Sequence, residues 1–354
     1  MRRVLVVGGA GYVGSVLTEE LLLRGYTVRV LDRFFFGDDG LRGVRDRIEL
    51  VEADMRAVSP AVLDGVDAVI NVGGLSNDPT AEYNPHANHE MNTVATATLA
   101  RLCKTRGVSR YVLASSCSIY DCGIANEGAD VLQDETSPVS PRAPYSVSKY
   151  AAEREILAMT DDRFCPVALR KGTVYGYSPR MRYDLVVNTF VRDALTKGRL
   201  TLHHGGEMWR PLVDVRDAAQ AYVALVEAED VAVRGQIFNL CYQNLRISEL
   251  ALRVREALRR LDIDVDIRPD YQHGSVRNYR VSGEKIARVL NFRPKVSIEE
   301  AVAELVRGAR ADGRTDFDNP RYYNIRWIQL LEDHRKAAGK PGSVLDAPAA
   351  PPSQ

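Results

Sequence analysis

The chain has 354 residues, of which 45% are hydrophobic, and it can therefore bury the core of one large domain or of two joined domains. Its 47 basic residues balance its 47 acidic residues, which argues against a nucleic-acid partner and against an anionic membrane surface. The apolar runs are far too short to span a bilayer. A small molecule is the partner that remains.

The cysteines are odd in number, scattered and free of any metal-ligand spacing, which argues against a disulfide framework and against a metal site. A reducing cytoplasm is therefore the expected location. The five residues concerned are Cys103, Cys117, Cys122, Cys165 and Cys241.

Short β-branched runs alternate with amphipathic stretches through the first half of the chain. Strands are expected within 2–9, 26–32, 47–54, 67–74 and 110–116, and the segment 14–25 is typical of the helices between them. Further strands are expected within 165–176 and 235–241. Uninterrupted apolar strands that alternate with helices predict a parallel sheet covered on both faces, which is a doubly wound α/β fold.

The pattern changes to helices and loops in two later segments. An apolar stripe within 246–261 predicts one helix, and Ser297 with Glu300 has the spacing of a capping box that opens another. We therefore expect a first domain of 1–175 with a late contribution from about 212–242. A smaller, discontinuous α/β substrate domain is expected at 176–211 and 243–337. The tail 338–354 is rich in Pro, Ala, Gly and Ser and is expected to be disordered.

Gly8, Gly11 and Gly14 form a glycine loop between the first expected strand and the first expected helix. Missing side chains there permit a tight turn, close approach of the backbone to a pyrophosphate, and helix–strand packing. The alternative is an ordinary tight turn, but the context of strand, turn and helix favours a dinucleotide site. The same loop places Tyr12 and Val13 beside the cofactor.

Asp32 ends the second expected strand, where a carboxylate accepts hydrogen bonds from the hydroxyls of the adenosine ribose. Because a carboxylate there repels a 2′-phosphate, the predicted cofactor is NAD, although the neighbouring Arg33 leaves NADP open. Asp54 and Met55 follow the third expected strand and are candidates for contacts with the adenine, with a surface carboxylate as the alternative for Asp54.

The segment "YSVSK" places Tyr145 and Lys149 one helical turn apart on the same face. A phenol has a pKa of about 10, so it needs a nearby cation to act as a base at neutral pH. Lys149 is that cation in our interpretation, and the positive nicotinamide lowers the pKa further. Taken alone, such a pair also occurs by chance in many helices.

In this order, "VVGGAGYVG", "SSCSIY", "YSVSK", "LRKGTVYG" and "WRPLVDVRDAAQAY" resemble the extended short-chain dehydrogenase/reductase family, the sugar-nucleotide epimerases and dehydratases. The resemblance implies a Rossmann-type fold, NAD, a nucleotide-diphosphate sugar and a homodimer. It also implies that Ser116 hydrogen-bonds the sugar hydroxyl, that Tyr145 removes its proton, and that Lys149 binds the nicotinamide ribose.

Further residues are candidates for substrate binding. Loops at the carboxyl ends of parallel strands face the ligand, which brings Ser76 and Asn77 toward the hexose. The resemblance assigns the diphosphate to Asn188 and its clamp to Arg210 and Arg277, whose guanidinium groups suit bidentate bonds. Thr173 stands where the family usually has an asparagine that contacts substrate.

Cys117 and Ser118 follow Ser116 where the related 4,6-dehydratases have Asp and Glu. A thiol and a hydroxyl do not readily replace these carboxylates, which disfavours both 4,6-dehydration and the decarboxylase branch. Both residues remain candidates for substrate contact. Cys117 is either an acid/base group, as a cysteine in this turn is in the GDP-mannose 3,5-epimerases, or a packing residue beside the nicotinamide.

The predicted function is NAD-dependent epimerisation at C4 of a nucleotide-diphosphate sugar, through a transient 4-keto sugar. One alternative is an NAD(P)-dependent oxidoreductase of such sugars, either a 4-keto reductase or a dehydrogenase. Another is a C3/C5 or C2 epimerase that uses Cys117. A non-enzymatic dinucleotide-binding regulator is disfavoured, because Tyr145 and Lys149 are both present.

Overall fold

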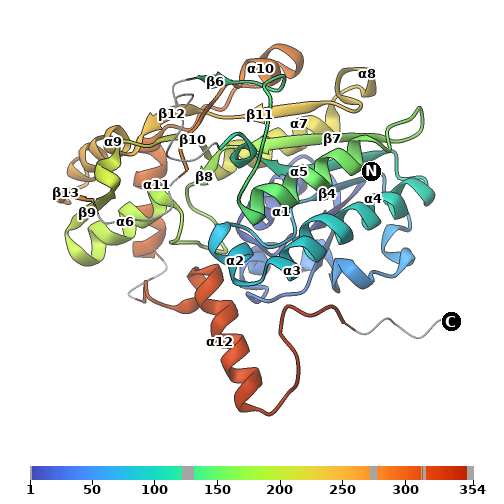
Figure 1. Ribbon diagram of the computed structural model, residues 1–354, viewed down its shortest axis with the longest axis horizontal. Helices are drawn as coiled ribbons and strands as arrows, with labels where there is room; N and C mark the ends of the chain where they lie inside the picture. The colour runs from blue at the N-terminus through green and yellow to red at the C-terminus, as the bar shows by residue number, and fades with distance from the viewer. Residues whose placement is uncertain (1, 122–130, 272–276, 312, 314–315, 349–354) are drawn as a thin grey trace.

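The computed structural model describes residues 2–121, 131–271, 277–311, 313 and 316–348. Within them the largest sheet has seven parallel strands in the order β11-β7-β5-β4-β1-β2-β3 (Figure 1). These strands are β1 (Arg3–Val7), β2 (Thr27–Asp32), β3 (Ile48–Glu52), β4 (Ala68–Asn71), β5 (Arg110–Ser116), β7 (Cys165–Lys171) and β11 (Ile237–Leu240). The predicted doubly wound parallel sheet is confirmed.

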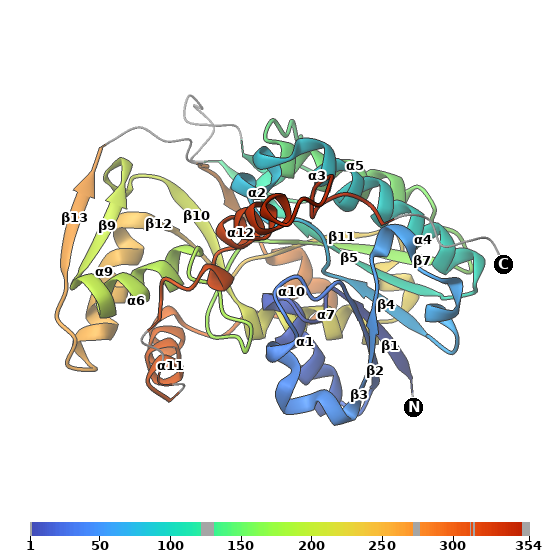
Figure 2. The same cartoon turned by 90° about the horizontal axis from the view of Figure 1, so that it is seen from below.

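Helices cover both faces of this sheet (Figure 2). On one face α1 (Tyr12–Leu23) packs against α7 (Val215–Glu227), and on the other α4 (Thr96–Thr105) packs beside α5 (Pro144–Leu157). The shorter helical turns of this part are η1 (Asp39–Arg47), η2 (Met55–Ala57), η3 (Pro60–Leu63), α2 (Asp78–Tyr83), α3 (Pro85–His89), the π-helical η4 (Glu90–Ala95), η5 (Cys117–Tyr120) and α8 (Asp230–Val233). A hydrophobic core lies on each face of the sheet.

A smaller part holds short sheets and helices. In one sheet β10 (Trp209–Asp214) lies between β8 (Thr173–Tyr175) and β12 (Gln243–Arg246); β9 (Arg199–His203) pairs with β13 (Asp266–Asp270), and β6 (Leu132–Gln133) with β14 (Arg280–Val281). The helical segments of this part are α6 (Val186–Lys197), η6 (His204–Gly206), α9 (Ile247–Arg259), α11 (Ile298–Ala311) and η7 (Pro320–Tyr322). In contrast, α10 (Glu284–Leu290) packs against β11 of the large sheet, and α12 (Asn324–Ala337) contacts both η7 and α2.

The local helix predictions agree with the structure. Leu250, Val254 and Leu258 of α9 are fully buried, as the apolar stripe predicts. Ser297 and Glu300 bond reciprocally at the start of α11, with the Ser297 backbone N–H donating to Glu300 at 2.8 Å and the Glu300 N–H donating to the Ser297 hydroxyl at 3.2 Å. The division of the chain into two domains stays a prediction.

The tail differs from expectation over its described part. The composition of 338–354 predicts disorder, yet Leu345 is fully buried and Val344 packs against the same core cluster. The backbone carbonyls of Val344 and Leu345 accept hydrogen bonds from Arg33 and Arg56. A single apolar anchor and two arginines therefore hold a segment whose composition alone favours disorder. Within the described chain, no helix combines the length and the apolar character needed to cross a bilayer.

Candidate active site

One cavity of about 510 Å³ lies at the carboxyl ends of the large sheet's strands and extends to the smaller part. Such an edge is where open α/β sheets bind ligands. Every predicted cofactor-binding and catalytic residue lines the cavity: Gly8, Gly11, Tyr12, Val13, Gly14, Asp32, Arg33, Asp54, Met55, Ser116, Tyr145 and Lys149.

The glycine loop fits a bound pyrophosphate. Gly8 has a φ of +78°, and a Cβ on Gly14 would lie 2.1 Å from the Gly8 carbonyl oxygen, so neither position accommodates a side chain. The loop leads directly into α1, whose free backbone N–H groups favour an anion. Tyr12 braces the turn by donating its hydroxyl to the Gly176 carbonyl at 2.6 Å.

Asp32 and Asp54, the two carboxylates predicted to contact adenosine, both line the cavity. Asp32 accepts the backbone N–H groups of Ala10 at 3.0 Å and Phe34 at 2.9 Å. Asp54 instead contacts two arginines, with Arg33 at 2.9 Å and Arg56 at 2.7 Å. Burial favours a higher pKa for Asp54, but Arg56 and Arg33 hold its pKa below the ordinary value. Asp54 is therefore ionised and already occupied by these side chains.

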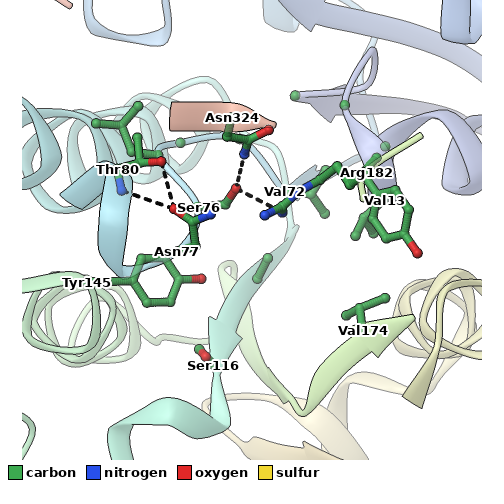
Figure 3. A pocket seen from close by; sticks show the side chains of 18 of the residues that line it. Val13, Val72, Ser76, Asn77, Thr80, Ser116, Tyr145, Val174, Arg182 and Asn324 are labelled. Atoms are coloured by element: carbon green, nitrogen blue, oxygen red, sulfur yellow. Dashed lines mark hydrogen bonds between the residues drawn. The ribbon is translucent and has the colours of Figure 1, made fainter. Parts of the chain in front are cut away.

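Ser116, Tyr145 and Lys149 converge on the cavity from two elements. Ser116 ends β5, and Tyr145 begins α5 with its hydroxyl turned toward the space in front of that strand (Figure 3). The Lys149 ammonium lies 5.9 Å from the centre of the Tyr145 ring. The sequence-predicted catalytic set is thus brought together around one space.

The electrostatics of Tyr145 differ from the expectation based on Lys149 alone. Burial raises the pKa of the phenol, and the largest opposing effect is the charge of Arg277. The Arg277 guanidinium lies 5.6 Å from the centre of the phenol ring. Arg277, predicted only as a diphosphate clamp, therefore also stabilises the phenolate. The nicotinamide of the predicted NAD would add a further positive charge beside the phenol.

A second lysine, which the sequence reasoning missed, stands beside Ser116. Lys171 ends β7 opposite Ser116 of β5, and its ammonium donates to the Ser115 carbonyl at 3.2 Å. Burial lowers the pKa of Lys171 to about 8, and burial with the charge of Lys171 lowers that of Lys149 to about 7. Neither lysine has a carboxylate partner among the described residues. The lysine stands in the strand exit "LRKGTVYG", but its place beside "SSCSIY" follows only from the pairing of β7 with β5.

The pair of lysines makes stability depend on pH. Their folded pKa values lie below the ordinary 10.5, so between about pH 7 and pH 10 the unfolded chain binds more protons and the free energy of unfolding rises with pH. Lys171→Met should flatten this rise and stabilise the cofactor-free protein near pH 7. Urea denaturation across that range measures the effect, with the exposed Lys336→Met as the control. If the free energy of unfolding of Lys171→Met rises with pH as steeply as that of the unchanged protein, the lowered pKa assigned to Lys171 is contradicted.

A polar network surrounds Ser76 and Asn77, the residues predicted to contact the hexose (Figure 3). Ser76 accepts hydrogen bonds from Asn324 at 2.7 Å and Arg182 at 3.2 Å. Asn77 caps α2 by accepting the Thr80 backbone N–H at 3.1 Å, and it donates to Asp184 at 3.0 Å. Arg182, Asp184 and Asn324 line the cavity too and were not identified from the sequence. Asn324 comes from α12 and has no local motif.

Thr173, Arg210 and Arg277 reach the same cavity. Arg277 pairs with Asp78, while Arg210 donates to the Trp209 carbonyl at 2.8 Å and to the carbonyl of Arg277. The Arg210 guanidinium thus contacts the backbone of Arg277, and both side chains line the cavity. Their role in binding stays a prediction.

Three predicted substrate residues do not reach the cavity. Cys117 and Ser118 are fully buried behind it: the Cys117 thiol donates to the Arg170 carbonyl at 3.0 Å, and Ser118 lies 2.9 Å from the Ser146 hydroxyl. The pKa of Cys117 lies well above its ordinary value because of burial. Asn188 is also fully buried, and its amide accepts the Gly176 N–H at 3.0 Å and donates to the Arg182 carbonyl at 2.9 Å. All three make internal hydrogen bonds outside the lining of the cavity, and their role in substrate binding stays a prediction.

A glycine loop, an acidic ribose site and a Ser-Tyr-Lys set around one cavity define an enzyme of the dinucleotide-binding α/β class. The sequence profile of the NAD dependent epimerase/dehydratase family matches residues 4–241, and the chain belongs to this family. It is therefore an enzyme of the nucleotide-sugar epimerase, dehydratase and decarboxylase group, and its cofactor is NAD.

The comparisons include both decarboxylases and dehydratases. The chain is 29% identical to UDP-glucuronic acid decarboxylase 2 of Arabidopsis thaliana over 315 residues, covering 87% of this chain and 68% of the relative. Among solved structures, MoeE5 in complex with UDP-glucuronic acid and NAD has a TM-score of 0.73 at 26% identity, covering 88% of this chain and 99% of the other. DesIV, a dTDP-glucose 4,6-dehydratase from Streptomyces venezuelae, has a TM-score of 0.74 at 26% identity, covering 88% and 97%.

Proposed function

We propose that the protein is an NAD-dependent epimerase that inverts C4 of a nucleotide-diphosphate sugar through a transient 4-keto sugar. The observation that carries the proposal is the convergence of Ser116, Tyr145 and Lys149 on the cavity, while Cys117 and Ser118 are turned away from it. With Ser116, Tyr145 and Lys149 as the reacting groups and no further acid or base, the site can oxidise and then reduce a single carbon of the sugar.

The residues divide this chemistry between them. Ser116 hydrogen-bonds the C4 hydroxyl, and Tyr145 removes its proton as the carbon-bound hydrogen departs as hydride. When bound, NAD would supply the acceptor for this hydride and then the donor of a hydride to C4 of the keto sugar. Lys149 binds the nicotinamide ribose, while Arg210 and Arg277 hold the diphosphate during rotation of the keto sugar. Tyr145 then returns the proton to the carbonyl oxygen, which restores both groups for the next cycle.

Lys171 favours a second candidate, the decarboxylation of a nucleotide-diphosphate uronic acid. An ammonium group beside Ser116 with no carboxylate partner in the described chain is suited to a C6 carboxylate of the sugar. Once C4 is a ketone, this carboxylate is β to the carbonyl and carbon dioxide can leave. The relatives named UDP-glucuronic acid decarboxylase and UDP-N-acetyl-alpha-D-glucosaminuronate decarboxylase support the same candidate.

One incubation distinguishes these functions. The purified protein, with no added cofactor, is mixed in D2O with UDP-, GDP-, CDP- and dTDP-sugars, uronic acids included, and the products are followed by mass spectrometry and proton NMR. A new diastereomer of unchanged mass supports the 4-epimerase, whereas loss of carbon dioxide supports the second candidate. Decarboxylation in D2O also places one deuteron on C5, so only deuterium at carbon without loss of carbon dioxide would instead restore Cys117 as an acid/base group. Turnover only with added NAD, NADH or NADPH would indicate a net oxidoreductase.

We also propose a homodimer formed through α5 and its neighbouring helical turn. Val147 of α5 is 44% exposed and Val94 of η4 is 40% exposed, and these elements pack side by side. Apolar side chains on adjacent helices are suited to an interface between two copies. Sedimentation velocity should give the mass of two chains, and a monomeric mass would refute the proposal.

A further inference from the structure

The end of the chain forms one wall of the cavity. Residues 324–348, the C-terminal strap, comprise α12 and the segment that folds back after it; Figure 2 shows α12 between the two parts of the molecule, with the tail running on across the part that holds the large sheet. Asn324, Ile325 and Ile328 line the cavity. Asn324 also accepts a hydrogen bond from Arg180 at 2.8 Å, and the Trp327 indole donates to the Phe35 carbonyl.

The far end of the strap is docked beside the adenosine end of the cavity. Leu345 is fully buried in the core cluster that also contains Leu31 and Met55, two residues that line the cavity. The turn that returns Leu345 to this cluster is fixed by Glu332 of α12, which is buried and accepts the Val344 backbone N–H at 3.1 Å. The strap is thus attached at both ends, and Leu345 anchors the second end.

This docked segment occupies two arginines near the ribose site. Arg33 donates to the Val344 carbonyl at 3.1 Å and stacks 4.0 Å from the centre of the Phe35 ring. Arg56 donates to the Leu345 and Asp346 carbonyls, each at 2.8 Å. Both arginines also pair with Asp54. The guanidinium groups of Arg33 and Arg56 are therefore engaged by the strap and by Asp54, while Arg33 also borders the cavity.

An arginine next to the ribose carboxylate is the group that accommodates the 2′-phosphate of NADP in this type of fold. Arg33 stands at that place, directly after Asp32, and Arg56 reaches the same carboxylate of Asp54. We propose that the C-terminal strap makes the site selective for NAD by holding Arg33 and Arg56 away from a 2′-phosphate. The inference concerns the cofactor alone and does not depend on which sugar reaction the enzyme catalyses.

Undocking the strap tests the proposal. Leu345→Asp places a charge in an apolar core and should expel the tail, whereas Ala347→Asp adds the same charge at an exposed position and is the matched control. Cofactor-free proteins are titrated with NAD and with NADP by calorimetry, with no sugar present. In Leu345→Asp the ratio of the NADP to the NAD dissociation constant should fall roughly tenfold, because a charge-assisted hydrogen bond to the phosphate becomes available. Ala347→Asp should keep the original ratio.

Arg33→Ala tests whether Arg33 is the residue that binds the 2′-phosphate of NADP in the undocked variant. In the intact chain this change should alter the ratio little, because the guanidinium is engaged by the strap. In the Leu345→Asp background it should restore discrimination against NADP. If Leu345→Asp does not fold, a chain ending at Gly339 is compared with one ending at Pro348, which keeps every described contact of the strap. An unchanged ratio in a folded, undocked variant would overturn the proposal and leave the strap a purely structural element.

Discussion

Replacing Tyr145 by phenylalanine should lower turnover by roughly a hundredfold to ten-thousandfold, the contribution of a positioned general base. The ring is 8% exposed, so phenylalanine keeps its packing and removes only the hydroxyl. NAD binding should change little, because the glycine loop and Asp32 are untouched. Initial rates with the substrate found in the sugar panel, together with calorimetric titration of NAD, measure the two effects.

Tyr150→Phe is the matched control, since Tyr150 lies on the same helix but does not line the cavity. Its rate should stay close to that of the unchanged protein. Substantial residual turnover in Tyr145→Phe would show that another group removes the proton. Lys171, which has a pKa of about 8, would then be the first residue to replace.

The residues predicted correctly to face the cavity belong to local motifs on neighbouring strand ends. Gly8, Asp32, Ser116 and Tyr145 each follow or end a strand, or begin a helix, that periodicity reveals, and a parallel sheet brings its carboxyl edges together whatever the intervening loops. The position of each motif at a strand end was therefore enough to predict that these residues lie close together in the fold.

The residues that were missed depend on long-range packing. Asn324 bonds to Ser76 across 248 positions, and neither residue carries a motif that points to the other. Lys171 becomes notable only because β7 lies beside β5, a pairing that places it opposite Ser116. Asn188 was assigned to the ligand by resemblance, but a buried amide must satisfy its own hydrogen bonds, and here backbone groups do so.

A buried ion pair joins α5, the helix that carries Tyr145 and Lys149, to the large sheet. Removing this pair should have a large effect on the free energy of unfolding. Arg170 of β7 and Glu153 of α5 form a two-point contact, with side chains only 3% and 1% exposed. Glu153 lies one turn beyond Lys149 on the same helix. The pair therefore fixes the helix that carries Tyr145 and Lys149 against the strand that ends in Lys171.

Glu153→Ala should lower the free energy of unfolding by about 3–5 kcal/mol, because it leaves the Arg170 charge buried without its carboxylate. Glu155→Ala is the control on the same helix: its partner Arg101 and Glu155 itself are 57% and 45% exposed, so the loss should stay below about 1 kcal/mol. Replacing Arg170 and Glu153 together by methionine should recover most of the stability, since no unpaired charge remains. Urea denaturation measures all three, and equal losses in the two single variants would mean that the buried pair has no special role in holding the catalytic helix.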